Sequence, residues 1–239
     1  MTEYLLYLES GPQKRKTMVH VPSLLGCIAN GPTTEAALAA TPDAIRAYLR
    51  FLRRAGEEVD PEAEFVTAIA EHVTEGIWLG NGSPYVTYGS DLEPVSEAEL
   101  PVLLRRYTRL REEIAAWADA QDDAALDAGV PGSSRSNRAV LLHVLGPTAA
   151  YVSGVIGSVP GVSAIQTQAE RGAMPVGEAL RRAGALVVER VAAATPEQRS
   201  AVIQRPKEVR TLRKALRRML EHDWEHLVEL SRRPNGPPI

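Results

Sequence analysis

Hydrophobic and polar positions change their pattern near residue 90. Before that point, short runs rich in β-branched and aromatic residues stand between turn-forming residues, which is typical of β-strands. Four such runs occur, at 3–10, 16–31, 64–73 and 83–89. The sequence therefore predicts a small sheet in the first part of the chain.

One helical pattern interrupts these runs. The segment 33–56 is rich in alanine and leucine, opens with the capping residues Thr33 and Thr34 and stops at Gly56. Pro42 lies inside it, and because proline has no backbone N–H, we expect the helix to split or kink there.

After residue 90 the strand patterns give way to four long helical patterns. They run over about 96–120, 134–157, 175–195 and 211–233, with loops rich in glycine and proline between them. Four helices with this spacing indicate an antiparallel four-helix bundle. We therefore expect an α+β protein with two domains, 1–90 and 91–239.

The last helical pattern has a clear apolar side. At about 100° per residue, its apolar residues fall in one sector, as in a helix that faces a core. These residues are Leu212, Ala215, Leu216, Met219, Leu220, Leu227 and Leu230. Five cations fall on the opposite side and are expected to face solvent: Arg210, Arg213, Lys214, Arg217 and Arg218. An anion-binding rim is the functional alternative for this basic run.

Two histidines, His222 and His226 in "LEHDWEHL", lie at the margin of the apolar sector. An i, i+4 pair lies about 40° apart around a helix and about 6 Å apart along it, so both rings can reach one ion. The alternative is two histidines at the edge of the core whose nitrogens are satisfied by carboxylates or backbone.

A third histidine favours the metal. His143 lies in "RAVLLHVLGPTAAYV", whose other residues are nearly all apolar, so we expect it to be buried as well. Three neutral imidazoles would hold a divalent cation (zinc, nickel or iron) and leave the remaining positions to water or substrate. That arrangement is typical of a catalytic site, because structural zinc sites close their coordination shell.

"HDWEH" also invites comparison with the H-E-x-x-H motif of zinc peptidases. Asp223 stands where those enzymes have a glutamate base, and only thirteen residues follow His226, too few for their downstream ligand. A peptidase is therefore not expected. The side chain of Asp223 is short and points about 100° away from His222, so we expect it beside a ligand, orienting an imidazole, and not on the metal.

Charge and composition narrow the class of protein. The 239 residues carry a net charge of −3, which gives no overall attraction to nucleic acids or membranes. No signal sequence is evident, and no stretch approaches the roughly 18 apolar residues of a membrane span. We expect a cytoplasmic protein. Cys27 is the only cysteine, which excludes an intrachain disulfide and a thiolate zinc site, and we expect it in the core.

Residues 96–239 resemble the DinB/YfiT-like family of metal-binding four-helix bundles. "LLHVLGPTAAYV" resembles the motif around the histidine of the family's second helix, and "LRRMLEHDWEHLVEL" closely resembles the H-x-x-x-H of its last helix. The resemblance implies His143, His222 and His226 as metal ligands. Many relatives carry an acidic residue where this chain has Thr148, so any chemistry that uses that carboxylate is in doubt.

The segment "VHVPSLLGCIANGPTTEAALAATPDAIRAYLRFL" contains a Pro-x-x-x-Gly-Cys turn followed by a helix start. In these features the first part of the chain resembles the HicB antitoxin core. It implies a sheet-plus-helix module that binds a protein partner or covers a substrate. The DNA-binding segment that usually follows such a domain is replaced here by the helical part.

The remaining histidines, His20 and His72, lie in predicted strands and are expected to be structural. The resemblances together imply a divalent-metal-binding protein, a metal-dependent hydrolase or a thiol-dependent transferase acting on a small molecule. The alternative is a non-catalytic, antitoxin-like regulator or binding protein whose bundle is stabilised by metal. The sequence leaves open the catalytic base, a protein partner of the HicB-like module and a homodimer.

Overall fold

The computed structural model describes residues 1–11, 16–129 and 132–239, which form two compact units. The first unit consists of Met1–Val95 and Arg199–Glu221, and the second of Ser96–Gln198 and His222–Ile239. The predicted division had a single boundary, whereas residues 199–221 here return to the first unit. The last change of unit falls inside one helix, α9 (Leu212–Ser231).

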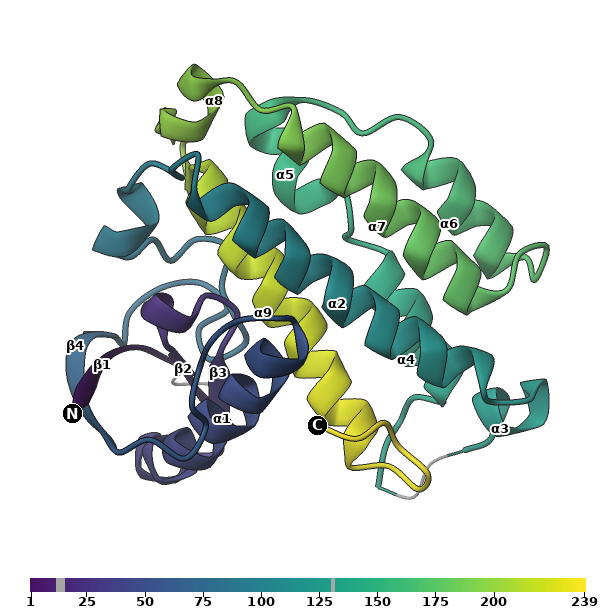
Figure 1. The fold of residues 1–239 in the computed structure, drawn as a ribbon, viewed down its shortest axis with the longest axis horizontal. Coiled ribbons are helices and arrows are strands. Elements are labelled where there is room, and N and C mark those ends of the chain that lie inside the picture. The colour runs from purple at the N-terminus through teal and green to yellow at the C-terminus, as the bar shows by residue number, and fades with distance from the viewer. Residues whose placement is uncertain (12–15, 130–131) are drawn as a thin grey trace. The chain divides into compact units, whose positions relative to one another are not determined.

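The first unit contains a mixed four-stranded sheet in the order β3-β2-β1-β4 (Figure 1). Its strands are β1 (Thr2–Gly11), β2 (Lys16–His20), β3 (Ile28–Gly31) and β4 (Phe65–Val73). The β1–β2 and β2–β3 pairs are antiparallel, and β4 pairs with β1 in parallel. The strands predicted at 3–10 and 64–73 are confirmed, and the run 16–31 forms two strands joined by the short 3-10 helix η1 (Pro22–Leu24).

Helix α1 (Thr34–Arg54) packs on β2 and β3. The hydroxyl of Thr33 accepts a hydrogen bond from the backbone N–H of Ala36, which caps the helix start as predicted. The helix continues through Pro42 and is not split there. Its following turns bury Ile45, Tyr48, Leu49, Phe51 and Leu52, and this packing outweighs the lost backbone hydrogen bond.

The strand predicted at 83–89 is wrong. This segment is an irregular loop that ends in the 3-10 helix η2 (Gly89–Leu92). The buried carboxylate of Glu9 accepts hydrogen bonds from the backbone N–H groups of Gly82 and Ser83, and Pro84 has no N–H to offer a neighbouring strand. The apolar residues of the loop instead form a small core, with Leu79, Val86 and Tyr88 packed against Tyr7 and Val73.

The first half of α9 also belongs to this unit and follows the hairpin of β5 (Ile203–Gln204) and β6 (Val209–Arg210). The prediction that its cations face solvent is wrong for Arg217 and Lys214, which are buried. The guanidinium of Arg217 lies between the buried carboxylates of Asp91 and Glu221. Lys214 Nζ donates to carbonyl and hydroxyl oxygens of the 84–87 loop and to Val209 O. A buried cation needs such partners, and the loop supplies them.

The second unit is helical (Figure 1). Its helices before α9 are α2 (Glu99–Asp119), α3 (Asp123–Asp127), α4 (Asn137–Leu145), α5 (Ala150–Ile156), α6 (Val162–Glu170), α7 (Val176–Ala192) and the first part of α8 (Pro196–Ser200). Helix α7 packs along α2 and also contacts α4, α5 and α6. The helices predicted at 96–120, 175–195 and 211–233 are confirmed, and α3, α6 and α8 were missed. The protein is therefore α+β, whereas its assignment to the two families stays a prediction.

The helix predicted at 134–157 is interrupted. It forms α4 and α5, with a turn at 146–149 that begins with Gly146 and Pro147. The expectation that no stretch approaches a membrane span is wrong by length and composition, since Asn137–Ile156 has both. Each half, however, is too short to cross a bilayer, and both contribute residues to the core, among them Val144 and Val152.

Candidate metal centre

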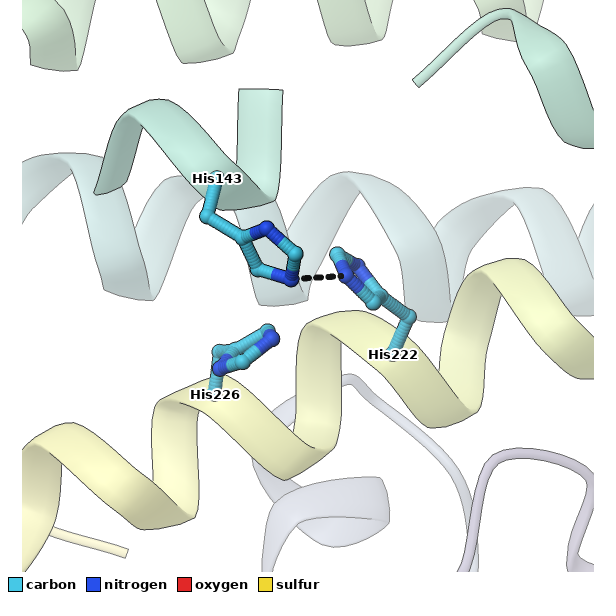
Figure 2. A group of neighbouring side chains, drawn as sticks. All are labelled: His143, His222 and His226. Carbon is cyan, nitrogen blue, oxygen red and sulfur yellow. Dashed lines mark hydrogen bonds between the residues drawn. The ribbon is translucent and has the colours of Figure 1, made fainter. Parts of the chain in front are cut away.

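Three histidines from two helices of the second unit come together at one point (Figure 2). His143 comes from α4, and His222 and His226 come from the second half of α9. One ring nitrogen from each lies within 4.8 Å of the other two. The structure thus brings together the three residues that the sequence singled out.

The α9 pair is positioned by the helix itself. The apolar sector predicted for this helix is confirmed, since all seven of its residues are buried. His222 and His226 lie beside that sector, only 8% and 6% exposed, with ring centroids 4.7 Å apart and ring planes at 80°. Residues four apart lie on the same side of a helix, so the two imidazoles point toward a common position.

His143 differs from the other two because it is exposed, so the prediction that it is buried is wrong. The buried side of α4 carries Val140, Leu141, Val144 and Leu145. His143 lies at the margin of that side, about 100° from Val144. The cluster is consequently accessible to solvent on the side of His143.

The nitrogen separations fit a metal ion. His143 Nε2 and His222 Nε2 lie 3.3 Å apart, the dashed line in Figure 2. Two nitrogens of a tetrahedral zinc site, each about 2.0–2.1 Å from the ion, lie about 3.4 Å apart. The other ring nitrogens lie within 4.8 Å of one another, and rotation of the rings would have to bring any longer separation to the same value on metal binding.

His226 is held from behind by a carboxylate. Its Nδ1 lies 2.8 Å from Glu229 Oε2, and Glu229 in turn accepts hydrogen bonds from Arg135 and Arg233. Burial alone would raise the pKa of Glu229, but the hydrogen bond to His226 and the nearby cationic charges lower it to about 2. A carboxylate at neutral pH can only accept, so Nδ1 of His226 carries a proton, and Nε2 is the nitrogen that remains for a ligand bond.

His222 has a carboxylate behind it as well. Its Nδ1 lies 3.5 Å from Oδ1 of Asp223, a buried residue whose carboxylate pairs with the buried guanidinium of Arg111. Burial alone would lower the pKa of Arg111, but the charge of Asp223 raises it, so the guanidinium stays charged. This geometry agrees with the expected place of Asp223 beside a ligand.

Two of the three histidines, His143 and His222, are poor bases in this cluster. Desolvation, followed by the neighbouring rings of His226 and His222, lowers the pKa of His143 to about 4. Desolvation also lowers the pKa of His222. Both rings are therefore neutral near pH 7, the state that metal ligation requires.

Neither of the other two candidate histidines belongs to this cluster. His20 is buried in the first unit, with Nδ1 2.7 Å from Glu221 Oε1. His72 is exposed on β4, with Nε2 2.8 Å from the hydroxyl of Ser10. Cys27 is fully buried, as expected for a core residue.

Sequence reasoning singled out Asp223 but missed two other groups behind the ligands, Glu229 and Arg111. Glu229 could have been found, because it lies three residues after His226 on the same helix. Arg111 could not, because it reaches Asp223 only through the packing of α2. The hydroxyl of Thr148 accepts a hydrogen bond from Arg111.

Comparison of the chain with protein-family models, with curated proteins and with solved structures finds no match in any of the three. The resemblances to DinB-like and HicB-like proteins thus rest on the motifs alone. Function has to be argued from the site.

Proposed function

We propose that this chain is a divalent-metal-binding protein whose ion is held by His143, His222 and His226. The observation that carries the proposal is the meeting of three imidazoles from α4 and α9, with ring nitrogens within 4.8 Å of one another. Nitrogen ligands suit zinc, nickel and iron, the three candidate metals. Carboxylates behind two of the rings add support, because ligating histidines commonly donate their second N–H to such a group.

The arrangement favours an enzyme over a structural site. Three ligands from the protein leave at least one coordination position open, and the exposure of His143 gives that position access from solvent. Neutral ligands also leave the charge of a divalent ion uncompensated, so the open position favours an anion such as hydroxide, thiolate or carboxylate. When bound, the ion would supply Lewis acidity and lower the pKa of a coordinated water or thiol.

On this basis we propose a metal-dependent hydrolase or a thiol-dependent transferase that acts on a small molecule. The protein groups would hold and orient the ion: His143 from the open side, and His222 and His226 from the buried side. Neither Asp223 nor Glu229 is proposed as a general base, because each already accepts hydrogen bonds from arginine.

A metal-stabilised scaffold is the second candidate. One observation favours it: the cluster joins α4 to α9, helices far apart in the sequence, so an ion there would cross-link the second unit. In that case the protein would be a regulator or binding protein. Its protein partner would be bound by the HicB-like module.

Metal analysis of the purified protein and its single variants tests the proposal. We expect about one ion per chain in the wild type and loss of most of it in His143→Ala, His222→Ala and His226→Ala. His72→Ala is the matched control, because His72 is exposed and lies outside the cluster. Full metal content in any variant of the three would remove that residue from the ligand set.

Cobalt substitution then separates enzyme from scaffold. An open site binds added azide, acetate or thiol, which shifts the visible absorption of the bound cobalt. A spectrum that none of these anions changes, in a protein that binds the metal, would overturn the enzyme proposal and leave the scaffold.

A further inference from the structure

The guanidinium of Arg111 lies behind the histidine cluster, in the interior of the second unit. Arg111 is on α2, is 3% exposed and has the ring of Tyr107 5.1 Å from its Cζ. Gly184 of α7 leaves room for it, since a Cβ there would lie 3.3 Å from Arg111 Cγ. A buried cation in so closely packed a place is costly unless its donors are used.

The donors of Arg111 go to two segments, and each segment carries a proposed metal ligand. Nε donates to Asp223 Oδ2 at 2.5 Å, and Nη2 lies 3.2 Å from Asp223 Oδ1. Asp223 follows His222 directly in the chain. Nη2 also lies 3.2 Å from the carbonyl oxygen of Val144, which follows His143, and 3.0 Å from the hydroxyl of Thr148.

The hydrogen bonds of Arg111 end there, because among the described residues Nη1 has no partner. One rigid, planar group therefore ties the residue after His143 to the residue after His222. A lysine cannot do this, because its single nitrogen lacks the fork that binds a carboxylate through two bonds.

We infer that Arg111 is a positioning residue of the metal centre, a clamp that sets the spacing of α4 and α9 and, through Asp223, the orientation of the His222 ring. With Asp223 held from behind, Nδ1 of His222 faces the carboxylate and Nε2 faces His143. The ligands are then largely in place before the metal binds. This raises the affinity for metal, because less conformational entropy is lost on binding. This inference rests on the proposed metal-binding function.

Two variants test the clamp in the full chain. Arg111→Lys keeps the charge and removes the fork. Thr148→Val keeps the volume and removes one acceptor of Nη2, without touching the Asp223 pair. Arg181→Lys is the matched control, because Arg181 of α7 also bridges two carboxylates, Glu112 and Asp119, on the outside of α2.

Cobalt affinity by competition, the visible spectrum of bound cobalt and the melting temperature of the metal-free protein are measured for each variant. We expect Arg111→Lys to weaken cobalt binding about 10–100-fold and to change the spectrum, with a smaller effect of the same kind in Thr148→Val. Arg181→Lys should leave affinity and spectrum unchanged. Wild-type affinity and spectrum in Arg111→Lys, whatever its melting temperature, would overturn the clamp. If Arg111→Lys does not fold, Thr148→Val decides by the same two readouts.

A wild-type protein that binds no metal would overturn the proposed function but not by itself the clamp. Nitrogen NMR of His222 in the metal-free protein then decides. We expect the proton on Nδ1 in the wild type and in Thr148→Val, which leaves the Asp223 pair intact, and a mixture of the two tautomers in Arg111→Lys. An unchanged tautomer in Arg111→Lys would overturn the clamp independently of the metal.

Discussion

Replacing Arg217 by methionine should destabilise the first unit strongly. Arg217 lies on the first half of α9 and is 1% exposed. Its Nε and Nη2 donate to the two oxygens of Asp91 at 2.7 and 2.9 Å, and its Nη1 lies 3.0 Å from Glu221 Oε2. Both carboxylates are themselves buried, so neither can turn to water when the guanidinium is removed.

The loss of stability depends on the hydrogen-bond partners that each carboxylate retains when Arg217 is replaced. Glu221 retains Arg218 and His20, with contacts of 3.1 and 2.7 Å. Asp91 retains the backbone N–H of Tyr88 at 3.0 Å. Removing one member of a buried ion pair typically costs about 3–5 kcal/mol, and the stranded charge of Asp91 puts Arg217→Met in that range. For a chain of this size, the melting temperature would fall by roughly 6–20 °C.

Urea unfolding at pH 7, followed by circular dichroism, measures the loss. Arg182→Met is the matched control, because Arg182 also forms an i, i+4 pair, with Glu178, but is 57% exposed. There we expect about 0.5 kcal/mol or less. Adding Asp91→Asn to Arg217→Met should recover part of the stability, since it removes the stranded charge. A loss below about 1 kcal/mol in Arg217→Met would refute the buried network and favour the solvent-facing arginine that the helical pattern predicts.

Two further predictions concern pH. In the metal-free protein, proton NMR should find His143 titrating near pH 4. His226→Ala should raise this pKa, because the neighbouring His226 ring is one cause of the lowering. Titration near 6.5 in the wild type would show that the rings are not crowded together. The pKa of Glu229 is lowered from 4.5 to about 2, so the stability that its ionised form contributes should be complete above pH 4.5 and be lost as pH falls toward 2. Acid unfolding of Glu229→Gln should lack this component, and identical acid curves for variant and wild type would contradict the assignment.

Much of the helical part could be predicted because its signals are local. The apolar sector of α9 depends only on the order of its residues, and all seven members are buried. The spacing of His222 and His226 is likewise a property of one helix. The meeting of these two with His143 was a weaker inference, supported by a family resemblance, and the structure does bring the three rings together.

The predictions from sequence are wrong where contacts with segments far away in the chain determine the local structure. The helical angle of Arg217 places it opposite the apolar sector of α9, where a solvent-facing side chain is expected. Asp91, from a distant part of the chain, packs against this side of the helix, so Arg217 is buried. The pattern at 83–89 is typical of a strand, but Glu9 binds the backbone N–H of Ser83 in place of a neighbouring strand. His143 looked buried because nearly every residue around it is apolar, and composition does not tell which way one side chain of a short helix points.

The buried polar groups of α9 differ in a way that bears on function. Each nitrogen of the Arg217 side chain has a carboxylate acceptor within the protein. In the histidine cluster, the carboxylates of Asp223 and Glu229 draw the protons of His222 and His226 to Nδ1, on the far side of each ring. His143 Nε2 and His222 Nε2 lie 3.3 Å apart. A cation between the rings would be a common partner for all three histidines, which supports the proposed metal over a satisfied core.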